Sequence, residues 1–232
     1  MYIQSNQLVT IEPIGESQQK VFDAWAKEKN LFLTGSAGTG KTFILLYLAL
    51  KAVLDKSTPY DKVVLVRSLL PSRDIGFLPG TLEEKSDLYQ DPYRILVRYL
   101  FEMPSDQGHE QLYNKLVGQG SLEFYSTSFL RGQTFDRSII IVDEASNLVF
   151  QELDTIMTRV GQDSKICFAG DTAQSDLRKH NGDREGYHNL QVILEEMEEF
   201  EVVEFGIGDI IRSGLVRSYL IAKTNLQVKD DS

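Results

Sequence analysis

The octapeptide GSAGTGKT, residues 35–42, is the most informative part of this 232-residue chain. It satisfies the pattern G-x-x-x-x-G-K-[ST], an apolar run at 31–33 precedes it, and an apolar helical pattern at 43–53 follows it. Strand, glycine-rich loop and helix in this order predict a P-loop, because glycines let backbone N–H groups point at phosphate oxygens beside a helix N-terminus. The alternative is a plain glycine turn before a helix.

Two side chains of this loop have separate predicted roles. Lys41 is expected to reach the β- and γ-phosphates, and the Thr42 hydroxyl is expected to hold Mg²⁺, which neutralises the triphosphate charge during cleavage. The predicted cofactors are therefore ATP and Mg²⁺. The predicted nucleotide-contacting residues of the loop are Gly35, Ser36, Ala37, Gly38, Thr39, Gly40, Lys41 and Thr42.

A second motif follows further along the chain. The apolar run 138–142 is followed by Asp143 and Glu144, which is a Walker B pattern. Asp143 at a strand end can hold Mg²⁺ through its water ligands, since this cation keeps an octahedral shell and takes few carboxylates directly. Glu144 can then act as the general base that polarises the attacking water. The alternative is a helix N-cap followed by an acidic first turn.

Two glutamines are further candidates for the same site. Gln174 lies in the loop 170–174 after the apolar run 166–169, where its amide could donate to a phosphate oxygen and accept from water. A plain Gly-Asp turn is the alternative there. Gln18, in the helix predicted over 17–29, could present its amide to adenine, whose edge offers one donor and one acceptor. A solvated helix residue is the other interpretation of Gln18.

Length and composition limit the architecture and the partners. With 42% hydrophobic and 25% charged residues, the chain resembles ordinary globular proteins, and its length suits one domain over 1–232 with a small insertion. The net charge of −10 argues against a nonspecific polyanion binder, so any nucleic-acid groove has to be local. The single cysteine, Cys167, predicts a buried thiol in a reducing compartment. No signal-like start or membrane-length apolar run is present, so we expect a cytoplasmic protein without membrane contact.

Short apolar runs alternate with helical patterns along most of the chain. The predicted strands cover 31–33, 62–66, 122–127, 138–142, 165–169 and 202–205, and the predicted helices cover 17–29, 43–53, 148–160, 187–199 and 215–223. This alternation indicates an α/β fold with a doubly wound, mainly parallel sheet and ligands at the carboxyl ends of its strands. The proline-interrupted segment 67–119 is predicted to be a helical insertion.

Together these motifs resemble those of the PhoH family of P-loop ATPases, which are similar to superfamily-one helicases. The resemblance covers about residues 16–224. Its motifs, in order, are GSAGTGKT, GFLPG (76–80), FLRGQT (129–134), IIIVDEA (139–145), TRVG (158–161), GDTAQSDL (170–177) and DIIR (209–212). The resemblance implies a RecA-like core and an ATP hydrolase that acts on single-stranded RNA or DNA as a helicase-like motor or remodeller. The alternative function is an ATP-regulated binding or host-interaction module without motor activity.

The helicase resemblance also implies where nucleic acid binds. It places a single strand at the loops after the second and third strands, with contacts from Arg67, Ser68, Thr127 and Arg131. The insertion adds side chains that suit phosphate contact and base stacking, namely Arg73, Arg94 and Arg98 with Tyr89, Tyr93 and Tyr99. The alternative is that the residues with helical spacing, Tyr93, Leu96, Val97 and Leu100, form the core of the insertion and that its arginines are solvated.

The resemblance leaves one positive charge to be supplied. In two-domain helicases the second RecA-like domain provides an arginine to the γ-phosphate, and we expect no second domain in this chain. We therefore predict a homo-oligomer, of which a ring is one form, in which an arginine of one subunit completes the site of its neighbour. Arg212 is the first candidate and Arg159 the second. The alternative for Arg212 is a salt bridge to Asp209 at a helix start.

Overall fold

The protein has an α/β fold built on a six-stranded sheet. The computed structural model describes residues 3–68, 82–127, 130, 132–171 and 181–230. The strands are hydrogen-bonded in the order β3-β2-β4-β5-β1-β6, and the pairs β1–β5, β1–β6 and β2–β3 are parallel. The predicted α/β class with a mainly parallel sheet is thus confirmed.

The chain divides into two compact units, which we call unit 1 and unit 2. Unit 1 comprises Met1–Ile11, Leu45–Ile141 and Thr155–Lys165, and unit 2 comprises Glu12–Ile44, Val142–Asp154 and Ile166–Ser232. The prediction of a single domain over 1–232 stays a prediction.

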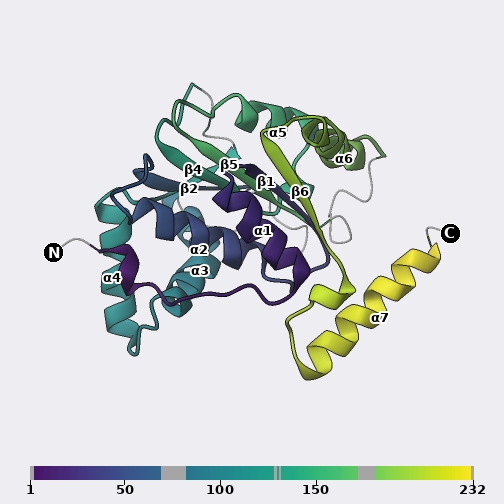
Figure 1. Ribbon diagram of the computed structural model, residues 1–232, viewed down its shortest axis with the longest axis horizontal. Coiled ribbons are helices and arrows are strands. Elements are labelled where there is room, and N and C mark those ends of the chain that lie inside the picture. Colours follow the sequence, from purple (N-terminus) through teal and green to yellow (C-terminus); the bar gives the residue numbers. More distant parts are fainter. Residues whose placement is uncertain (1–2, 69–81, 128–129, 131, 172–180, 231–232) are drawn as a thin grey trace. The chain divides into compact units, whose positions relative to one another are not determined.

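Unit 2 contains the strand that leads into the P-loop. Its elements are α1 (Glu16–Ala26), β1 (Asn30–Gly35), β5 (Lys165–Ala169), α6 (Asn181–Glu195), β6 (Phe200–Phe205) and α7 (Gly214–Asp230) (Figure 1). β1 lies between β5 and β6 with its central residues fully buried, and α1 and α6 pack against β6. Because β1 and β5 are parallel, their carboxyl ends share one edge of the sheet. The P-loop and the segment that begins at Gly170 leave the sheet at that edge.

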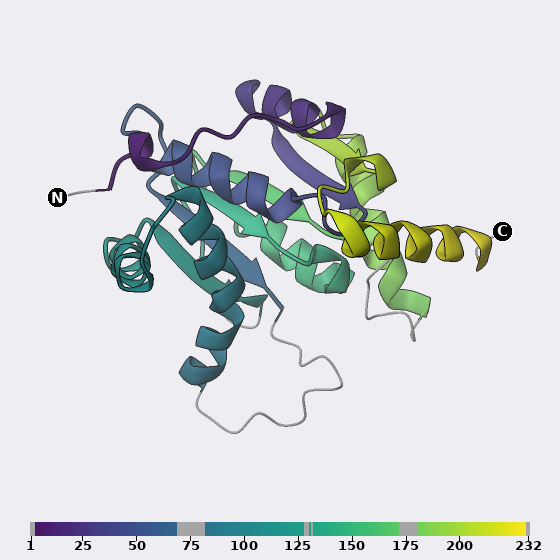
Figure 2. The same ribbon diagram turned by 90° about the horizontal axis from the view of Figure 1, so that it is seen from below.

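Unit 1 contains the helices of the predicted insertion. Its elements are β2 (Lys62–Arg67), α3 (Leu82–Leu100), α4 (Asp106–Gly118), β3 (Leu122–Ser126) and most of β4 (Ser138–Val142). α2 (Lys41–Val53) begins in unit 2 and continues here, whereas α5 (Phe150–Met157) ends here. Figure 2 shows α3 and α4 in teal. Tyr93 of α3 is buried against Phe124 of β3, with ring centroids 6.0 Å apart, so this tyrosine belongs to the core of unit 1.

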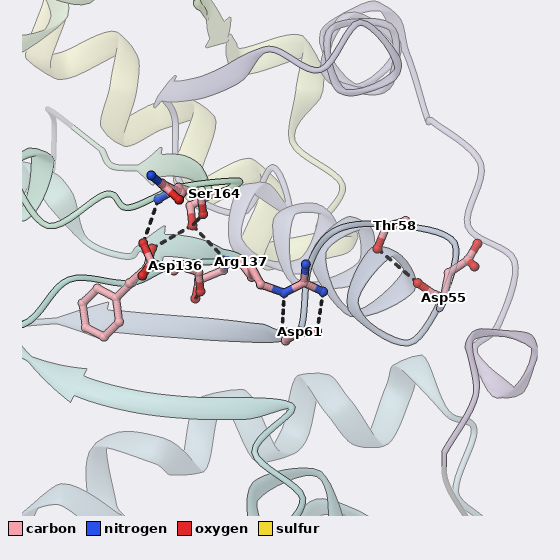
Figure 3. A network of polar contacts seen from close by, with 9 residues as sticks. Asp55, Thr58, Asp61, Asp136, Arg137 and Ser164 are labelled. Carbon is pink, nitrogen blue, oxygen red and sulfur yellow. Dashed lines mark hydrogen bonds and ion pairs between the residues drawn. The ribbon is translucent and has the colours of Figure 1, made fainter.

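A polar network in unit 1 joins the segments that precede β2, β4 and β5 (Figure 3). The Arg137 guanidinium donates to both carboxylate oxygens of Asp61, at 2.6 and 3.0 Å. The Ser138 backbone N–H donates to Ser164 Oγ at 3.0 Å, and that hydroxyl donates to the Phe135 carbonyl at 2.7 Å. These contacts hold the amino ends of the strands, away from the edge where ligands are expected.

Helix boundaries differ from prediction where side chains have other partners. α1 covers 16–26 rather than the predicted 17–29, with Gly15 as its N-cap, and the hydroxyl of Ser17 donates to Asp209 at 2.9 Å. α5 ends at Met157 rather than at 160, and Val160 instead forms an isolated parallel bridge with Phe135. α6 begins earlier and ends earlier than predicted, at Asn181 and Glu195. It ends at the start of an acidic run, because carboxylates are unfavourable at a helix C-terminus. The run consists of Glu195, Glu196, Glu198, Glu199 and Glu201.

Candidate nucleotide-binding site

The P-loop of unit 2 is folded around the ammonium group of Lys41. Lys41 Nζ donates to the carbonyl oxygens of Gly35 at 2.9 Å and Ser36 at 2.7 Å, and to Thr39 Oγ1 at 3.3 Å. Lys41 is the first residue of α2, so the loop lies at the N-terminus of a long helix. A helix N-terminus and a lysine together favour an anionic ligand such as a phosphate group.

The end of β6 fixes where this loop begins. The Ser36 N–H donates to the Phe205 carbonyl at 2.8 Å, and Gly35 has a φ of +107°. A Cβ atom on residue 35 would lie 2.1 Å from that same carbonyl oxygen. Only glycine therefore fits at this position, both for its backbone angle and for the space available.

Burial and two nearby carboxylates shift the pKa of Lys41 in opposite directions. The side chain is 8% exposed, and burial lowers the pKa of its ammonium group to about 8, while Asp171 and Asp143 act to raise it. Asp171 is a site residue that we did not single out from the sequence, although it belongs to the quoted motif GDTAQSDL. Its backbone N–H donates to Ser146 Oγ at 3.1 Å, which ties the end of β5 to the 3-10 turn η3 (Ala145–Asn147).

This pKa predicts a pH dependence of nucleotide affinity. Phosphate binding needs the charged ammonium, so affinity should fall by up to about tenfold per pH unit above 8, where Lys41 loses its proton. Equilibrium titration of a fluorescent ATP analogue between pH 7.5 and 9.5 measures the effect. Lys41→Arg is the control, since a guanidinium stays charged throughout this range and its affinity should not follow the same slope. A wild-type affinity that is flat up to pH 9.5 would contradict the prediction.

The structure brings Thr42 and Asp143, the two predicted Mg²⁺ ligands, into contact. The Thr42 hydroxyl donates to Asp143 Oδ1 at 2.7 Å, although the two residues are far apart in the sequence. Thr42 lies in the first turn of α2, and Asp143 follows the last residue of β4. A hydroxyl and a carboxylate held side by side are the hard oxygen donors that Mg²⁺ prefers, so the residues present fit this cation.

Glu144 has an uncommon backbone conformation. Its φ is +50° and its ψ is +37°, in the left-handed region, and its side chain is exposed. Residues other than glycine, asparagine and aspartate rarely adopt this conformation, and such residues concentrate at functional sites. Glu144 precedes the turn η3 without a side-chain capping hydrogen bond, which disfavours the helix-cap alternative.

Gln18 is buried against the P-loop and is not a solvated helix residue. It is 3% exposed, its Oε1 accepts from the Ile14 N–H at 2.8 Å, and its Nε2 donates to the Thr39 carbonyl at 3.3 Å. The amide therefore positions the loop. A contact between Gln18 and adenine stays a proposal.

The segment after β6 contacts the tip of the P-loop. The Ile211 N–H donates to the Gly38 carbonyl at 3.2 Å, and a Cβ on Gly38 would lie 3.1 Å from both Arg212 Cγ and Leu220 Cδ1.

The predicted alternative for Arg212, a salt bridge to Asp209, is absent, since within the described part of the chain these two residues form no ion pair. Asp209 accepts instead from Ser17 Oγ and from the Gly206 N–H at 2.8 Å. The hydrophobic pattern of the sequence does not predict the contact between Ile211 and Gly38.

The predicted nucleic-acid residues that the structure describes lie in unit 1. Arg67 ends β2, Ser68 follows it, and Thr127 follows the last residue of β3. The Arg67 guanidinium lies 6.0 Å from the ring centroid of Tyr89 on α3. Arg131 and Gln174 lie outside the described residues.

Arg159, the second candidate for the missing positive charge, is engaged within unit 1. Its guanidinium donates to the Thr155 carbonyl at 3.3 Å, to the Gln133 carbonyl at 3.4 Å and to Thr158 Oγ1 at 3.0 Å. These bonds make Arg212 the better candidate.

In the described part of the chain, no helix has both the length and the apolar character needed to cross a bilayer.

Comparison with known proteins gives one family and several similar solved structures. Residues 10–223 match the family described as PhoH-like protein. The PhoH-like protein of Mycobacterium leprae is 32% identical over 222 residues, which cover 95% of this chain and 60% of that protein. Protein PhoH of Escherichia coli K12 is 32% identical over 210 residues, which cover 89% of this chain and 56% of that protein. The chain thus spans less than two thirds of the length of these relatives.

Two solved structures are similar to this chain over most of its length. Unliganded Pif1 from Bacteroides sp is similar over 88% of this chain and 43% of that chain, with 19% identity and a TM-score of 0.39. The Pyrococcus furiosus Hef helicase domain is similar over 87% of this chain and 39% of that chain, with 16% identity and a TM-score of 0.42.

Proposed function

The chain belongs to the family of PhoH-like proteins, and from this premise we propose that it is a Mg²⁺-dependent ATPase that acts on single-stranded RNA or DNA. One observation carries the proposal. Within unit 2, the Lys41 ammonium group, the Thr42–Asp143 pair and the exposed Glu144 carboxylate belong to one loop, one helix start and one strand end. These are the groups that hydrolysis of a nucleoside triphosphate requires.

Each residue has one step in the proposed reaction. The Lys41 ammonium group exchanges its bonds to loop carbonyls for bonds to phosphate oxygens, and the backbone of the loop, with Gln18 behind it, holds the phosphates in place. Thr42 and Asp143 would hold Mg²⁺, which supplies positive charge to the phosphates when bound. Glu144 accepts a proton from the attacking water, as a general base does. Gln174 is proposed to orient that water.

Phosphate release measured with and without Mg²⁺ tests the proposal. We expect steady turnover with Mg²⁺ and none in the presence of a chelator. The other candidate function, an ATP-regulated binding module, predicts nucleotide binding without turnover. The buried Cys167 suits a reducing compartment, so we place this activity in the cytoplasm.

The proposed nucleic-acid contacts have support in unit 1. Arg67 lies opposite Ser126 in the parallel register of β2 and β3, and the Ser126 hydroxyl is buried without a hydrogen-bond partner among the described residues. Tyr89 and Tyr93 lie one turn apart on α3, one beside Arg67 and the other against Phe124. A cation beside an aromatic ring at the end of a strand suits a backbone phosphate of a single-stranded nucleic acid.

We expect single-stranded nucleic acid to stimulate the ATPase at low salt and Arg67→Ala to lose that stimulation. An acidic protein offers few phosphate contacts, so the stimulation should fade as salt rises. Loss of the Arg67 contact should lower the number of phosphate contacts calculated from the salt dependence of the affinity by about one. Phosphate release with oligo-dT and oligo-U, together with fluorescence anisotropy, measures both effects.

Arg98→Ala is the matched control for this experiment, because Arg98 also lies on unit 1 but pairs with Asp106. It should keep full stimulation. If Arg67→Ala is stimulated as strongly as the wild type, the nucleic-acid site lies elsewhere. If no strand stimulates or binds the wild type, the binding-module alternative is favoured.

We also propose that the protein works as a homo-oligomer in which Arg212 completes the site of a neighbouring subunit. The Arg212 side chain is exposed, and its stem lies on the tip of the P-loop of its own subunit. Because the side chain is exposed, its guanidinium is accessible to a neighbouring subunit, whereas the contact of its stem also allows it to act on its own P-loop.

A further inference from the structure

Tyr187 of α6 packs against Gly170, the residue that follows β5. Its ring is 2% exposed and lies 4.8 Å from the ring of Phe32 on β1, measured between centroids. A Cβ atom on Gly170 would lie 2.5 Å from the Tyr187 hydroxyl oxygen and 3.0 Å from the backbone nitrogen of Ser146. The hydroxyl thus fills the space that any side chain at residue 170 would need, directly beside Asp171.

The position of Tyr187 is set by the preceding residue as well. A Cβ atom on Gly186 would lie 2.7 Å from the backbone nitrogen of Phe150, the first residue of α5. α6 therefore lies directly against the start of α5, in the segment that follows Glu144 and η3. All of these residues belong to unit 2.

The Tyr187 hydroxyl has no hydrogen-bond partner among the described residues, although it is buried. Burial raises the pKa of its phenol and Asp171 raises it further, while the Thr34 side chain acts in the opposite direction without meeting hydrogen-bond geometry. Buried polar groups are nearly always bonded, because an unmade bond is costly. A hydroxyl kept in such a place therefore needs an explanation.

Asp171 is the neighbour whose electrostatic surroundings would change if nucleotide bound at Lys41. Its backbone is held by Ser146, and its carboxylate lies within the electrostatic reach of the Lys41 ammonium group. The phosphate oxygens of a bound triphosphate would bind the ammonium group of Lys41 and would bring negative charge close to Asp171. The carboxylate would then gain from a new donor, and the buried Tyr187 hydroxyl, which lies beside Gly170, is a donor within its electrostatic reach.

We infer that Tyr187 is a positioning residue whose hydroxyl donates to the Asp171 carboxylate when nucleotide fills the P-loop, holding the end of β5 in place for hydrolysis. This inference rests on the proposed ATPase function. It assigns a role in catalysis to α6, which contributes no residue to the P-loop or to the Walker B motif.

Tyr187→Phe tests the inference, because it removes only the hydroxyl. The thermal midpoint of the protein without nucleotide should stay the same or rise, since no bond is lost. The rise in midpoint produced by Mg²⁺ and the non-hydrolysable analogue AMP-PNP should shrink. Turnover should fall about tenfold with less than a twofold change in KM, as expected for one hydrogen bond to a charged group made only in the reacting state.

Tyr113→Phe is the matched control. Tyr113 is as deeply buried, on α4 of unit 1, but its hydroxyl donates to Gln90 Oε1 at 3.3 Å. Its loss should lower the midpoint without nucleotide and leave turnover and the AMP-PNP shift unchanged. Asp171→Asn gives a second check: if the two groups act as a pair, Tyr187→Phe should cost little more in the Asp171→Asn background.

The outcomes separate this inference from the proposed function. Wild-type turnover and a wild-type AMP-PNP shift in Tyr187→Phe would overturn the inference and leave the ATPase proposal standing. A midpoint without nucleotide that falls as in Tyr113→Phe, with turnover unchanged, would mean a structural role only and would also overturn it. If the wild type binds AMP-PNP but does not hydrolyse ATP, the proposed function fails, and the AMP-PNP shift alone decides whether Tyr187 responds to nucleotide.

Discussion

Glu144→Gln is expected to bind ATP as the wild type does and to lose turnover by about 10²- to 10⁴-fold, the range for loss of a general base. The amide keeps the shape of the side chain but cannot take a proton. The backbone strain at this residue should be unchanged, because the left-handed conformation belongs to the main chain. Any loss of activity then reports on the carboxylate itself.

Two measurements check this expectation. Titration with a fluorescent ATP analogue gives the affinity, and single-turnover phosphate release gives the rate of the chemical step. Glu196→Gln is the matched control, because it makes the same chemical change at an exposed carboxylate of the acidic run in unit 2. Wild-type turnover in Glu144→Gln would remove Glu144 from the catalytic residues.

Arg212→Ala should lose turnover by roughly 10³-fold or more, as loss of an arginine finger does. The guanidinium would stabilise charge that builds on the γ-phosphate, which no other described side chain of the site except Lys41 is placed to do. Nucleotide affinity should change far less than turnover, since the contact matters most in the transition state. Arg217→Ala, which removes an exposed arginine of the same helix region, should have little effect.

Mixing two inactive variants shows which subunit Arg212 serves. Lys41→Ala and Arg212→Ala should together restore part of the activity if subunits share sites, because some interfaces then pair an intact P-loop with an intact arginine. If the mixture stays inactive, Arg212 acts on its own P-loop, as the contact of its stem with Gly38 allows. Full activity of Arg212→Ala, or of a dilute monomer, would rule out the shared site.

The parts of the fold that were predictable from sequence are those with local patterns. β4 and β5 begin and end at the predicted residues, because each is a buried run that starts with one polar residue and is otherwise apolar. That Thr42 and Asp143 lie together was also predictable, since motif spacing and strand ends specify it without knowledge of packing, whereas the roles of these residues stay predictions.

The remaining contacts join residues that no period or spacing connects. The bond from Ile211 to Gly38 and the fit of Tyr187 against Gly170 depend on how strands are ordered in the sheet, which the sequence does not state. Gln18 shows the same difficulty, since its helical position gave no sign that its amide would be buried under the P-loop. Ser17 has the residue type of an N-cap, but a tertiary partner, Asp209, was available to it.

The bonds between Lys41 and the carbonyls of its own loop have a consequence for how a ligand binds. They hold the loop in a folded shape by an internal cation, so an arriving triphosphate does not have to order a disordered backbone. Binding mainly requires phosphate oxygens to replace the loop carbonyl oxygens as hydrogen-bond acceptors of the Lys41 ammonium group, which exchanges one set of hydrogen bonds for a similar one. Such preorganisation lowers the entropic cost of binding, so that more of the gross interaction energy appears as affinity.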